Sequence, residues 1–446
     1  MFIIDGNKVV WEHAAAASQL AAPPAARQPL HLAHHISRPD TQLVRLGRVV
    51  RLDTVTQNYE VVSLGTGSKC IGATKMSPEG IKLNDSHAEV FARRGFMLYI
   101  YKNIEKAMMS MSPRETIFIK ENGQFRLRDN IEFVFYSSQM PCGDASIIPK
   151  SNDNDYGNIV TSRKREAEGN NDEIESKILM NDIDDIHRTG AKCLPHNEQD
   201  PKGPGAKYHL LGQVRTKPGL GDRTLSVSCS DKIARWIHVG IQGALLDMLL
   251  TEPIYIKHFI FGGGVPYSKE SLIRAFLNRN EKQQITVPVT PHIYQTTAIF
   301  HHIKSEQRPR PAPGSVLLVK FGVIEVAVHG KKLGVTKKME GTKRIALYIS
   351  KYYLYRRFLN LLQKDSCLRE KLADSELESI PYNVMKRKSQ RYYDNWHKVK
   401  NDFFKSWTVK PDMWSFCITL EELAANSIDL HKRIHFVDPE RPLHMT

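Results

Sequence analysis

The sequence predicts a layered α/β domain, in which strands of one sheet alternate with helices. Short runs of apolar and β-branched residues at 59–64 and 131–136 are typical of buried strands. Helical apolar patterns follow both runs, after residues 85 and 141. The last quarter of the chain, from Lys343 onward, is rich in Lys, Arg, Tyr and Trp and predicts a helical region packed on this domain.

The expected elements follow one another from about residue 44. Residues 1–43 are rich in Ala, Pro and His with little periodicity, and they predict a flexible tail. The later elements are expected in this order: a strand at 59–64, a turn at 65–68, a helix from 86 to 100, a strand at 131–136 with a short helix after 142, a strand at 225–228, one apolar-faced helix over about 231–250, and strands near 254–261 and 316–328.

Residues 151–205 interrupt this pattern. They are crowded with Asn, Asp, Glu, Gly and Pro, a composition typical of a long surface insertion that is partly disordered. Such an insertion would separate motifs in the sequence without dividing the fold. We therefore expect residues 44–446 to form a single domain.

Charge and cysteine content narrow the class of protein. The net charge of +15 favours a polyanionic partner, although a basic soluble protein without such a partner is an equal alternative. No stretch approaches the length needed to cross a bilayer, and the N-terminus lacks a signal-peptide pattern. Six scattered cysteines suit a reducing compartment. We expect an intracellular monomer, cytoplasmic or nuclear, that is not secreted and has no membrane partner.

Three short motifs contain the residue types of a catalytic metal site. His87 is followed two residues later by Glu89, Cys142 comes directly after Pro141, and Cys229 lies at the end of a predicted strand. One histidine, two cysteines and such a glutamate are the set that zinc-dependent nucleobase deaminases use. Zinc takes three protein ligands and a water, and the glutamate moves protons.

Each motif also has a structural explanation. Ser86 and Glu89 fit a helix capping box, which is compatible with a metal site because both side chains would lie at the helix entry. Cys142 could be an inert buried thiol, since many small deaminases have a second cysteine where Ala145 stands. Cys229 at an equivalent strand-to-helix junction makes a chance arrangement less plausible. The cysteines expected to be structural or surface thiols are Cys70, Cys193, Cys367 and Cys417.

These motifs resemble the deaminase domain of the RNA-editing adenosine deaminases, and the tRNA-specific branch most of all. The similarity spans about residues 59–416 and implies a cytidine-deaminase-like mixed sheet with flanking helices, enlarged by a C-terminal helical region that encloses a polyanion site. Markers of the tRNA-specific branch are SIIP at 146–149, RTGAKC at 188–193, KPG at 217–219 with GDRT at 221–224, and LGVTKK at 333–338.

The resemblance implies a role for each candidate residue. Zinc would be held by His87, Cys142 and Cys229, and an activated water would attack C6 of adenine. Glu89 would transfer protons, and the product would be inosine. The positions that contact the target nucleotide in relatives are Ser68, in place of the usual threonine, and Lys69.

The resemblance also implies a buried inositol hexakisphosphate, because converging buried cations would repel one another without a dense anion among them. Solvated surface charges, or an RNA-binding surface with stacking aromatics, are the alternatives. A polar relay between phosphate and zinc is implied at Asp85, Lys217 and Lys232. Trp396 and Val409 depart from the family's lysine and glutamate. The implied ligands of the inositol phosphate are Asn84, Arg93, Arg94, Lys232, Arg235, Lys351, Tyr382, Lys386, Tyr392, Trp407 and Lys410.

The expected substrate is tRNA. Residues 215–217 run directly into 218–223, without the longer loop and glutamate of the duplex editors, and Ser146 replaces their arginine. No separate double-stranded-RNA-binding domain fits in the first forty residues. Extruding a base from a duplex costs a few kcal/mol, so a base already displayed in a loop is favoured.

The resemblance implies the adenosine 3′ of the anticodon, position 37, of tRNA-Ala. Editing of double-stranded RNA and an inactive RNA-binding relative are the alternatives. The intact Glu89 and three metal ligands count against the inactive relative.

Overall fold

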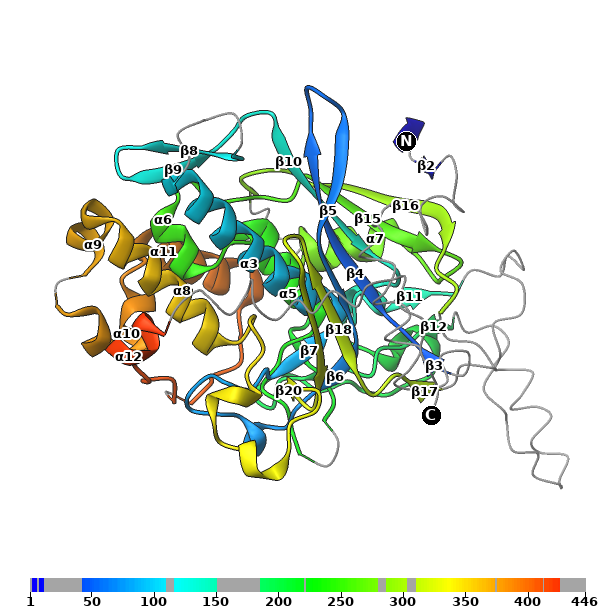
Figure 1. Ribbon diagram of the computed structural model, residues 1–446. Helices are drawn as coiled ribbons and strands as arrows, with labels where there is room; N and C mark the ends of the chain where they lie inside the picture. Colours follow the sequence, from blue (N-terminus) through cyan, green and yellow to red (C-terminus); the bar gives the residue numbers. More distant parts are fainter. Residues whose placement is uncertain are drawn as a thin grey trace, which may run out of the picture.

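One large sheet forms the centre of the protein (Figure 1). The computed structural model describes residues 2–5, 8–11, 42–109, 116–150, 185–219, 222–279, 286–302, 310–373, 375–411 and 413–425. In spatial order the ten strands of the sheet are β1 (Phe2–Asp5), β2 (Lys8–Trp11), β16 (His292–Ile299), β15 (His258–Gly263), β10 (Ile131–Ser137), β4 (Leu46–Asp53), β5 (Asn58–Thr66), β18 (Ser315–Val319), β19 (Val323–Val328) and β20 (Lys331–Lys332).

The sheet is mixed. Strands β10, β15, β16 and β2 pair in parallel, whereas β4, β5, β18 and β19 continue the sheet with antiparallel pairs. The carboxyl end of the central strand β10 leads into Cys142. The candidate metal residues therefore lie at the ends of the strands and not beside an outer strand of the sheet. A mixed sheet flanked by helices confirms the predicted α/β class.

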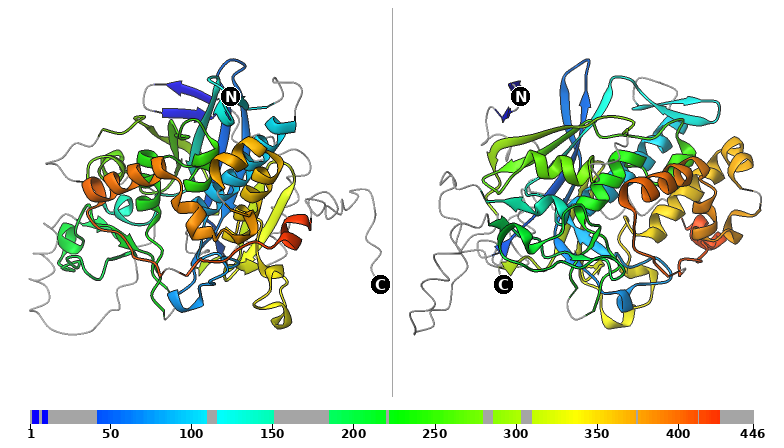
Figure 2. Two further views of the ribbon diagram at one scale, coloured as in Figure 1. Left: turned by 90° about the vertical axis from the view of Figure 1, so that its left-hand side faces the viewer. Right: turned by 180° about the vertical axis from the view of Figure 1, so that it is seen from behind.

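Helices cover the sheet and continue into a C-terminal helical region (Figure 1; Figure 2). The helices next to the sheet are α3 (Ala88–Met109), α5 (Cys229–Val239), α6 (Ala244–Leu249) and α7 (Lys269–Phe276). Packed on α3, α5 and α6 are α8 (Lys351–Lys364), α10 (Tyr382–Arg387) and α11 (Gln390–Val399), followed by the π-helix η9 (Lys400–Phe404), with α9 (Ser366–Leu372) and α12 (Leu420–Ala424) further out.

Short elements complete the described chain. Two-stranded pairs are β3 (Gln42–Leu43) with β17 (Arg310–Pro311), β6 (Ser68–Cys70) with β7 (Asp85–His87), β8 (Phe118–Glu121) with β9 (Gln124–Leu127), β11 (Ile148–Pro149) with β12 (Ile186–His187), and β13 (Lys192–Cys193) with β14 (Arg215–Thr216). The 3₁₀ turns are η2 (Ala73–Lys75), η4 (Asp144–Ser146), η5 (Gly205–Tyr208), η6 (Lys337–Met339), η7 (Lys343–Ile345) and η8 (Leu377–Ser379).

Several predicted elements have different boundaries in the structure. The single helix expected over 231–250 is wrong: it is divided into α5 and α6, because Gly240 and Gly243 adopt φ values of 93° and 77° that end a right-handed helix. The strand expected at 225–228 reduces to one bridge, between Val227 and Thr216. The expected strand at 316–328 is the hairpin of β18 and β19, and β4 is an additional strand before β5.

The predicted tail and insertion fall only partly within the described residues. In the segment 1–43, β1 and β2 extend the sheet beside β16. In the segment 151–205, residues 185–205 carry β12 and β13, and residues 151–184 lie outside the described ranges. Asp200 binds the fully buried Arg215 through two contacts of 2.6 and 2.7 Å, which attaches this part of the segment to the domain.

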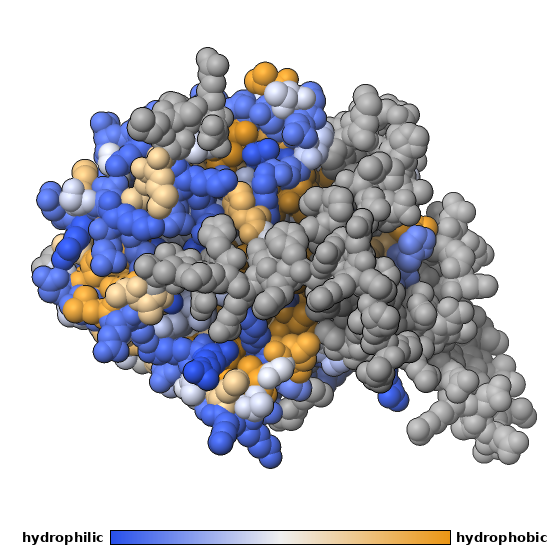
Figure 3. Space-filling view, viewed as in Figure 1, coloured by the Kyte–Doolittle hydropathy of each residue, from blue (hydrophilic) through white to orange (hydrophobic). Residues whose placement is uncertain are grey.

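The outer surface of the described chain is mainly hydrophilic on the face shown in Figure 3. Within the described ranges, no helix combines the length and the apolar composition that crossing a bilayer requires.

Helix α3 lies unusually close to the sheet. An added Cβ at Gly65 of β5 would stand 2.5 Å from the Phe91 Cβ and 2.6 Å from the Ala92 amide nitrogen. At Gly95 of α3, it would stand 2.2 Å from the Ser63 hydroxyl, which donates a hydrogen bond to the Ala92 carbonyl. This contact fixes the start of α3, where His87 and Glu89 lie, on the sheet.

We expect Gly65→Ala to destabilise the protein by about 1–3 kcal/mol, because the new methyl group overpacks the contact with α3. Chemical denaturation would measure the change. Gly190→Ala is the matched control, since a Cβ there meets nothing within 4 Å. Equal stability of the two variants would contradict the proposed close packing.

Candidate functional site

Three side chains from three separate segments meet at the ends of the strands. His87 ends β7, Cys142 follows β10, and Cys229 is the first residue of α5. The His87 Nδ1 atom lies 3.9 Å from the Cys142 Sγ and 3.6 Å from the Cys229 Sγ. One ligand atom of each residue lies within 4.8 Å of the other two.

This geometry fits a tetrahedral zinc site. With Zn–S bonds of about 2.3 Å and Zn–N bonds of about 2.0–2.1 Å, tetrahedral ligand atoms lie about 3.6–3.8 Å apart. The observed separations of 3.6 and 3.9 Å agree with this spacing. The donor set, one imidazole and two thiols, is also one that zinc prefers, and it leaves a fourth position open.

The electrostatic environment favours thiolates. A hydrogen bond from Cys229 holds the pKa of Cys142 well below its ordinary value, against the effect of burial. Burial, followed by the neighbouring Cys142, raises the pKa of Cys229 well above its ordinary value. The two thiols therefore share a proton, and a divalent cation would release it because it stabilises both thiolates.

Glu89 lies in the first turn of α3 and is 1% exposed. Its Oε2 atom is buried without a hydrogen-bond partner among the described residues. Its negative charge contributes to the raised pKa of Cys229, which places the carboxylate beside the three candidate ligands. A buried carboxylate with an uncommitted oxygen is suited to accepting and returning a proton.

A buried polar chain begins at Cys229. The Lys217 ammonium donates to the Cys229 Sγ at 3.1 Å and to the Asp85 Oδ2 at 2.7 Å, and Lys232 also forms an ion pair with Asp85. Burial alone would raise the pKa of Asp85, but these two ammonium groups hold it well below its usual range. Burial would lower the pKa of Lys217, but Asp85 and the Cys229 thiol raise it well above its usual value.

The residues predicted to contact the nucleotide lie beside the candidate ligands. In the β6–β7 pair, Ser68 stands directly opposite His87, and Lys69 stands opposite Ser86. Thr189 also lies near the candidate ligands, although the sequence analysis gives it no role of its own. Its hydroxyl accepts a hydrogen bond from the Gly143 amide, next to Cys142, at 3.1 Å. In the sequence, only its place in the RTGAKC motif at 188–193 indicates that it matters.

Seven basic side chains from distant segments interact electrostatically with one another, and Lys232 is one of them. Burial and the neighbouring cations lower the pKa of Lys386 to about 7 and that of Lys410 to about 8. Lys410 is an exposed residue whose ammonium interacts electrostatically with Lys232, Arg235 and Arg94. We call this set the cation cluster, and its members are Arg93, Arg94, Lys232, Arg235, Lys351, Lys386 and Lys410.

Aromatic rings line the cation cluster. The Arg235 guanidinium lies 3.6 Å from the centre of the Trp396 ring, 5.5 Å from that of Tyr392 and 5.7 Å from that of Trp407. Trp396, which departs from the lysine of relatives, therefore packs on a cation instead of adding another. Tyr382 interacts electrostatically with Arg94 and stacks on a neighbouring phenylalanine.

Trp414 belongs to the lining of this cluster, although the sequence analysis does not name it. Its ring centre lies 4.0 Å from the Lys351 ammonium and 5.6 Å from that of Lys410. Its position four residues after Lys410 is only a weak indication of this contact in the sequence. The Asn84 side chain donates to the Met76 sulfur at 3.2 Å, and its place among the ligands of the anion stays a prediction.

Comparison with known proteins identifies the family. Residues 63–411 match the model of the adenosine-deaminase (editase) domain. The chain belongs to the editase family. It is an enzyme that deaminates adenosine, and the family implies a zinc site that the His87–Cys142–Cys229 group could provide.

Curated relatives span most of this editase. It is 34% identical to "tRNA-specific adenosine deaminase 1" of Drosophila melanogaster, over 82% of this chain and 88% of that protein. Identity to the Homo sapiens protein of the same name is 32%, over 79% and 87% of the two chains. "Double-stranded RNA-specific editase Adar" of Drosophila melanogaster is 32% identical over 52% of this chain and 31% of its own length.

The helix entry differs from the predicted capping box. Among the hydrogen bonds of the described residues there is none from the Glu89 amide to the Ser86 hydroxyl. Instead β7 runs directly into α3, and the His87 amide donates to the Asp85 Oδ1 at 3.0 Å. The Glu89 side chain therefore takes no part in a capping box.

We expect Cys229→Ser to lower the zinc content of the purified editase from about one ion per chain to well below half, because a serine hydroxyl is a poor zinc ligand. Elemental analysis by mass spectrometry would measure it. Cys367→Ser, at an exposed cysteine, is the control and should retain the metal. Equal zinc content in both variants would contradict the assignment.

Proposed function

We propose that this editase hydrolytically deaminates adenosine to inosine in tRNA, with zinc held by His87, Cys142 and Cys229. The observation that carries the proposal is the convergence of these three donors beside the buried, unpartnered carboxylate of Glu89. The relatives that match most of the chain are named tRNA-specific adenosine deaminases, which supports tRNA as the substrate class.

The side chains of the site divide the reaction between them. A zinc ion bound there would lower the pKa of a coordinated water to about 7. Glu89 takes one proton from the attacking water, as the C6–O bond forms, and delivers it to the adenine ring nitrogen. It then takes the second proton from the new hydroxyl group on C6 and delivers it to the amino group, which leaves as ammonia when the C6–N bond breaks. Lys217, through its 3.1 Å contact, opposes the raised pKa of Cys229 and so favours its thiolate.

The proposed target is the adenosine 3′ of the anticodon, position 37, of tRNA-Ala. The short connection from β14 to residue 223 supports a substrate whose base is already unstacked, because it lacks a loop that could replace an extruded base. Ser68 and Lys69, opposite the metal-ligand strand, would contact the target nucleotide.

We also propose that the cation cluster holds inositol hexakisphosphate. Seven converging cations without an anion would repel one another, and burial together with this repulsion lowers the pKa of Lys351, Lys386 and Lys410. The Arg94 Nη2 and Arg235 Nε atoms are buried and lack partners among the described residues, so they are free to donate to phosphate. Asp85, Lys217 and Lys232 would then link the anion to Cys229.

We expect the purified protein to form inosine at one anticodon-loop adenosine of unmodified tRNA-Ala, read by sequencing. Glu89→Gln should lower the rate by at least about 10³-fold, because it removes the proton carrier while preserving the side-chain shape. Glu370→Gln, at an exposed helix position, should retain the wild-type rate.

An RNA duplex assayed in parallel tests the alternative substrate. Inosine in the duplex with none in tRNA would contradict the proposal and favour the double-stranded-RNA editor. Inosine in neither RNA would favour the inactive relative.

We expect denatured protein to release about one inositol hexakisphosphate per chain, measured by phosphate analysis and mass spectrometry. Lys386→Gln combined with Lys410→Gln should reduce that amount and lower the unfolding temperature, because the two substitutions remove charges that face the anion. Lys398→Gln, an exposed lysine on α11, is the matched control. An active, folded protein without any polyphosphate would contradict the assignment.

A further inference from the structure

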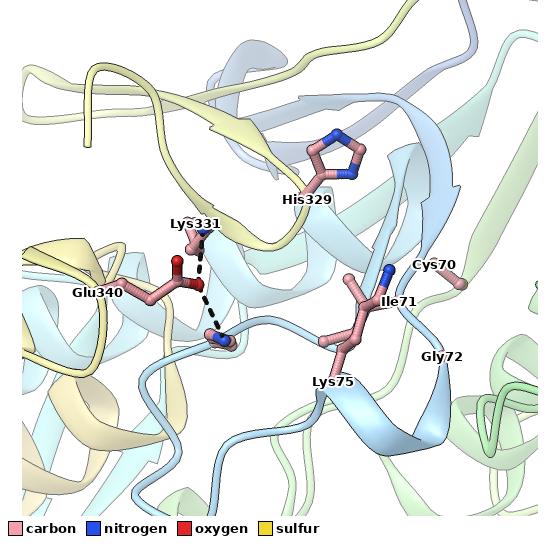
Figure 4. Close-up of a pocket in the computed structure, with 8 residues that line it drawn as sticks. Cys70, Ile71, Gly72, Lys75, His329, Lys331 and Glu340 are labelled. Atoms are coloured by element: carbon pink, nitrogen blue, oxygen red, sulfur yellow. Dashed lines mark hydrogen bonds and ion pairs between the residues drawn. The ribbon is translucent and has the colours of Figure 1, made fainter. Parts of the chain in front are cut away.

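A basic cavity of about 410 Å³ lies beside the candidate active site (Figure 4). Three lysines and one glutamate line it, so its charged lining has a net charge of +2, three minus one. None of these residues belongs to the zinc site or to the cation cluster. The lining residues are Cys70, Ile71, Gly72, Lys75, Lys82, His329, Lys331 and Glu340.

The cavity shares a wall with the metal-ligand group. Cys70 ends β6, the strand that carries Ser68 and Lys69, and its Sγ lies within 4.8 Å of a ring nitrogen of His87. From Cys70 the wall continues through Gly72 to Lys75. If the target nucleotide of the RNA contacts Ser68, the adjacent nucleotide of the same RNA strand would therefore lie at the cavity.

The acidic groups near the cavity are already bound. Glu340 accepts from Lys331 at 2.9 Å and from Lys82 at 3.5 Å, so one carboxylate orients two ammonium groups (Figure 4). Asp222 accepts from the Thr74 amide at 2.9 Å and the Thr74 hydroxyl at 2.6 Å. Lys75 forms no salt bridge within the described ranges and interacts with Asp222 only at longer range, so its ammonium can still contact a ligand.

Backbone contacts attach both sides of the cavity to residues 83 and 84, which lead directly into the active-site strand β7. The Leu83 amide donates to the Gly330 carbonyl at 2.9 Å, which docks the β19–β20 turn beside Lys82. A Cβ at Gly330 would stand 2.3 Å from the Leu83 carbonyl oxygen, so this close contact requires glycine. On the other side, the Ile71 amide donates to the Asn84 carbonyl at 3.1 Å. The lysines are thus held at a fixed place relative to His87.

The LGVTKK motif at 333–338 connects two charged residues of the cavity lining. It connects Lys331 of β20 to Glu340 and includes the turn η6, which carries the exposed residues Lys337 and Lys338. The cavity wall is therefore continuous with further positive surface, whereas the cation cluster is internal.

We propose that this cavity binds a backbone phosphate of the substrate RNA, next to the nucleotide that enters the active site. The proposal rests on the RNA deaminase function and names a further contact of the same site. Lysine ammonium groups bind phosphate as point charges without reading the base, so the cavity would position the strand and would not select its sequence. A free phosphate ion has the same chemistry, and the test separates the two sources.

The test compares three full-length proteins with wild type by steady-state kinetics on tRNA at several salt concentrations. Lys75→Gln combined with Lys331→Gln should raise KM about tenfold and leave kcat within about twofold. The slope of log(kcat/KM) against log[salt] should become shallower by about 0.7–0.9 for each phosphate that the protein no longer neutralises. The double arginine variant at these positions should restore both values, and Lys398→Gln should match wild type.

Each outcome either supports or refutes the phosphate contact. If the wild-type protein forms no inosine in tRNA, the proposed function is itself refuted. If wild type is active but the glutamine variant matches Lys398→Gln, or has a reduced kcat with KM unchanged, the phosphate contact is refuted while the function stands. Inhibition of wild type by millimolar inorganic phosphate, with KM for tRNA unaffected by the substitutions, would assign the cavity to a free anion and refute the RNA contact. Lys75→Gln alone gives the same comparison if the double variant unfolds.

Discussion

The buried charge chain from Cys229 through Lys217 and Asp85 to Lys232 is the constraint on which the rest of the structure depends. None of these charges is tolerable alone at its depth, because desolvation of an isolated ion costs several kcal/mol. Asp85 lies between two ammonium groups, and Lys217 lies between a carboxylate and a thiol. The metal-ligand group and the cation cluster are consequently parts of one electrostatic unit.

The backbone supplies the precision that this unit needs. The close approach of α3 to β5 at Gly65 fixes His87 and Glu89 relative to the sheet. The Cys229 amide, at the start of α5, donates to the Cys142 Sγ at 3.3 Å, which joins the second and third segments. Ligands from three segments that are far apart in sequence therefore reach one point because of sheet and helix contacts, not through a local motif.

Much of this arrangement is predictable from the sequence, and the limits have physical causes. The α/β class, the strands around β5 and β10, and the family follow from apolar periodicity and from motifs of fixed spacing. The break between α5 and α6 does not, because a glycine within an apolar helical pattern reveals its positive φ only in three dimensions. The capping box at Ser86 failed as a prediction because β7 pairs with β6, a nonlocal contact that local propensity does not report.

The cation cluster draws on both ends of the domain: Arg93 and Arg94 come from the first helix of the described chain, and Lys410 lies close to its last. During translation, the arginines emerge from the ribosome more than three hundred residues before that lysine. The cluster can therefore close only after Lys410 has been synthesised, and its cations are brought together by contacts between segments that lie far apart in the sequence.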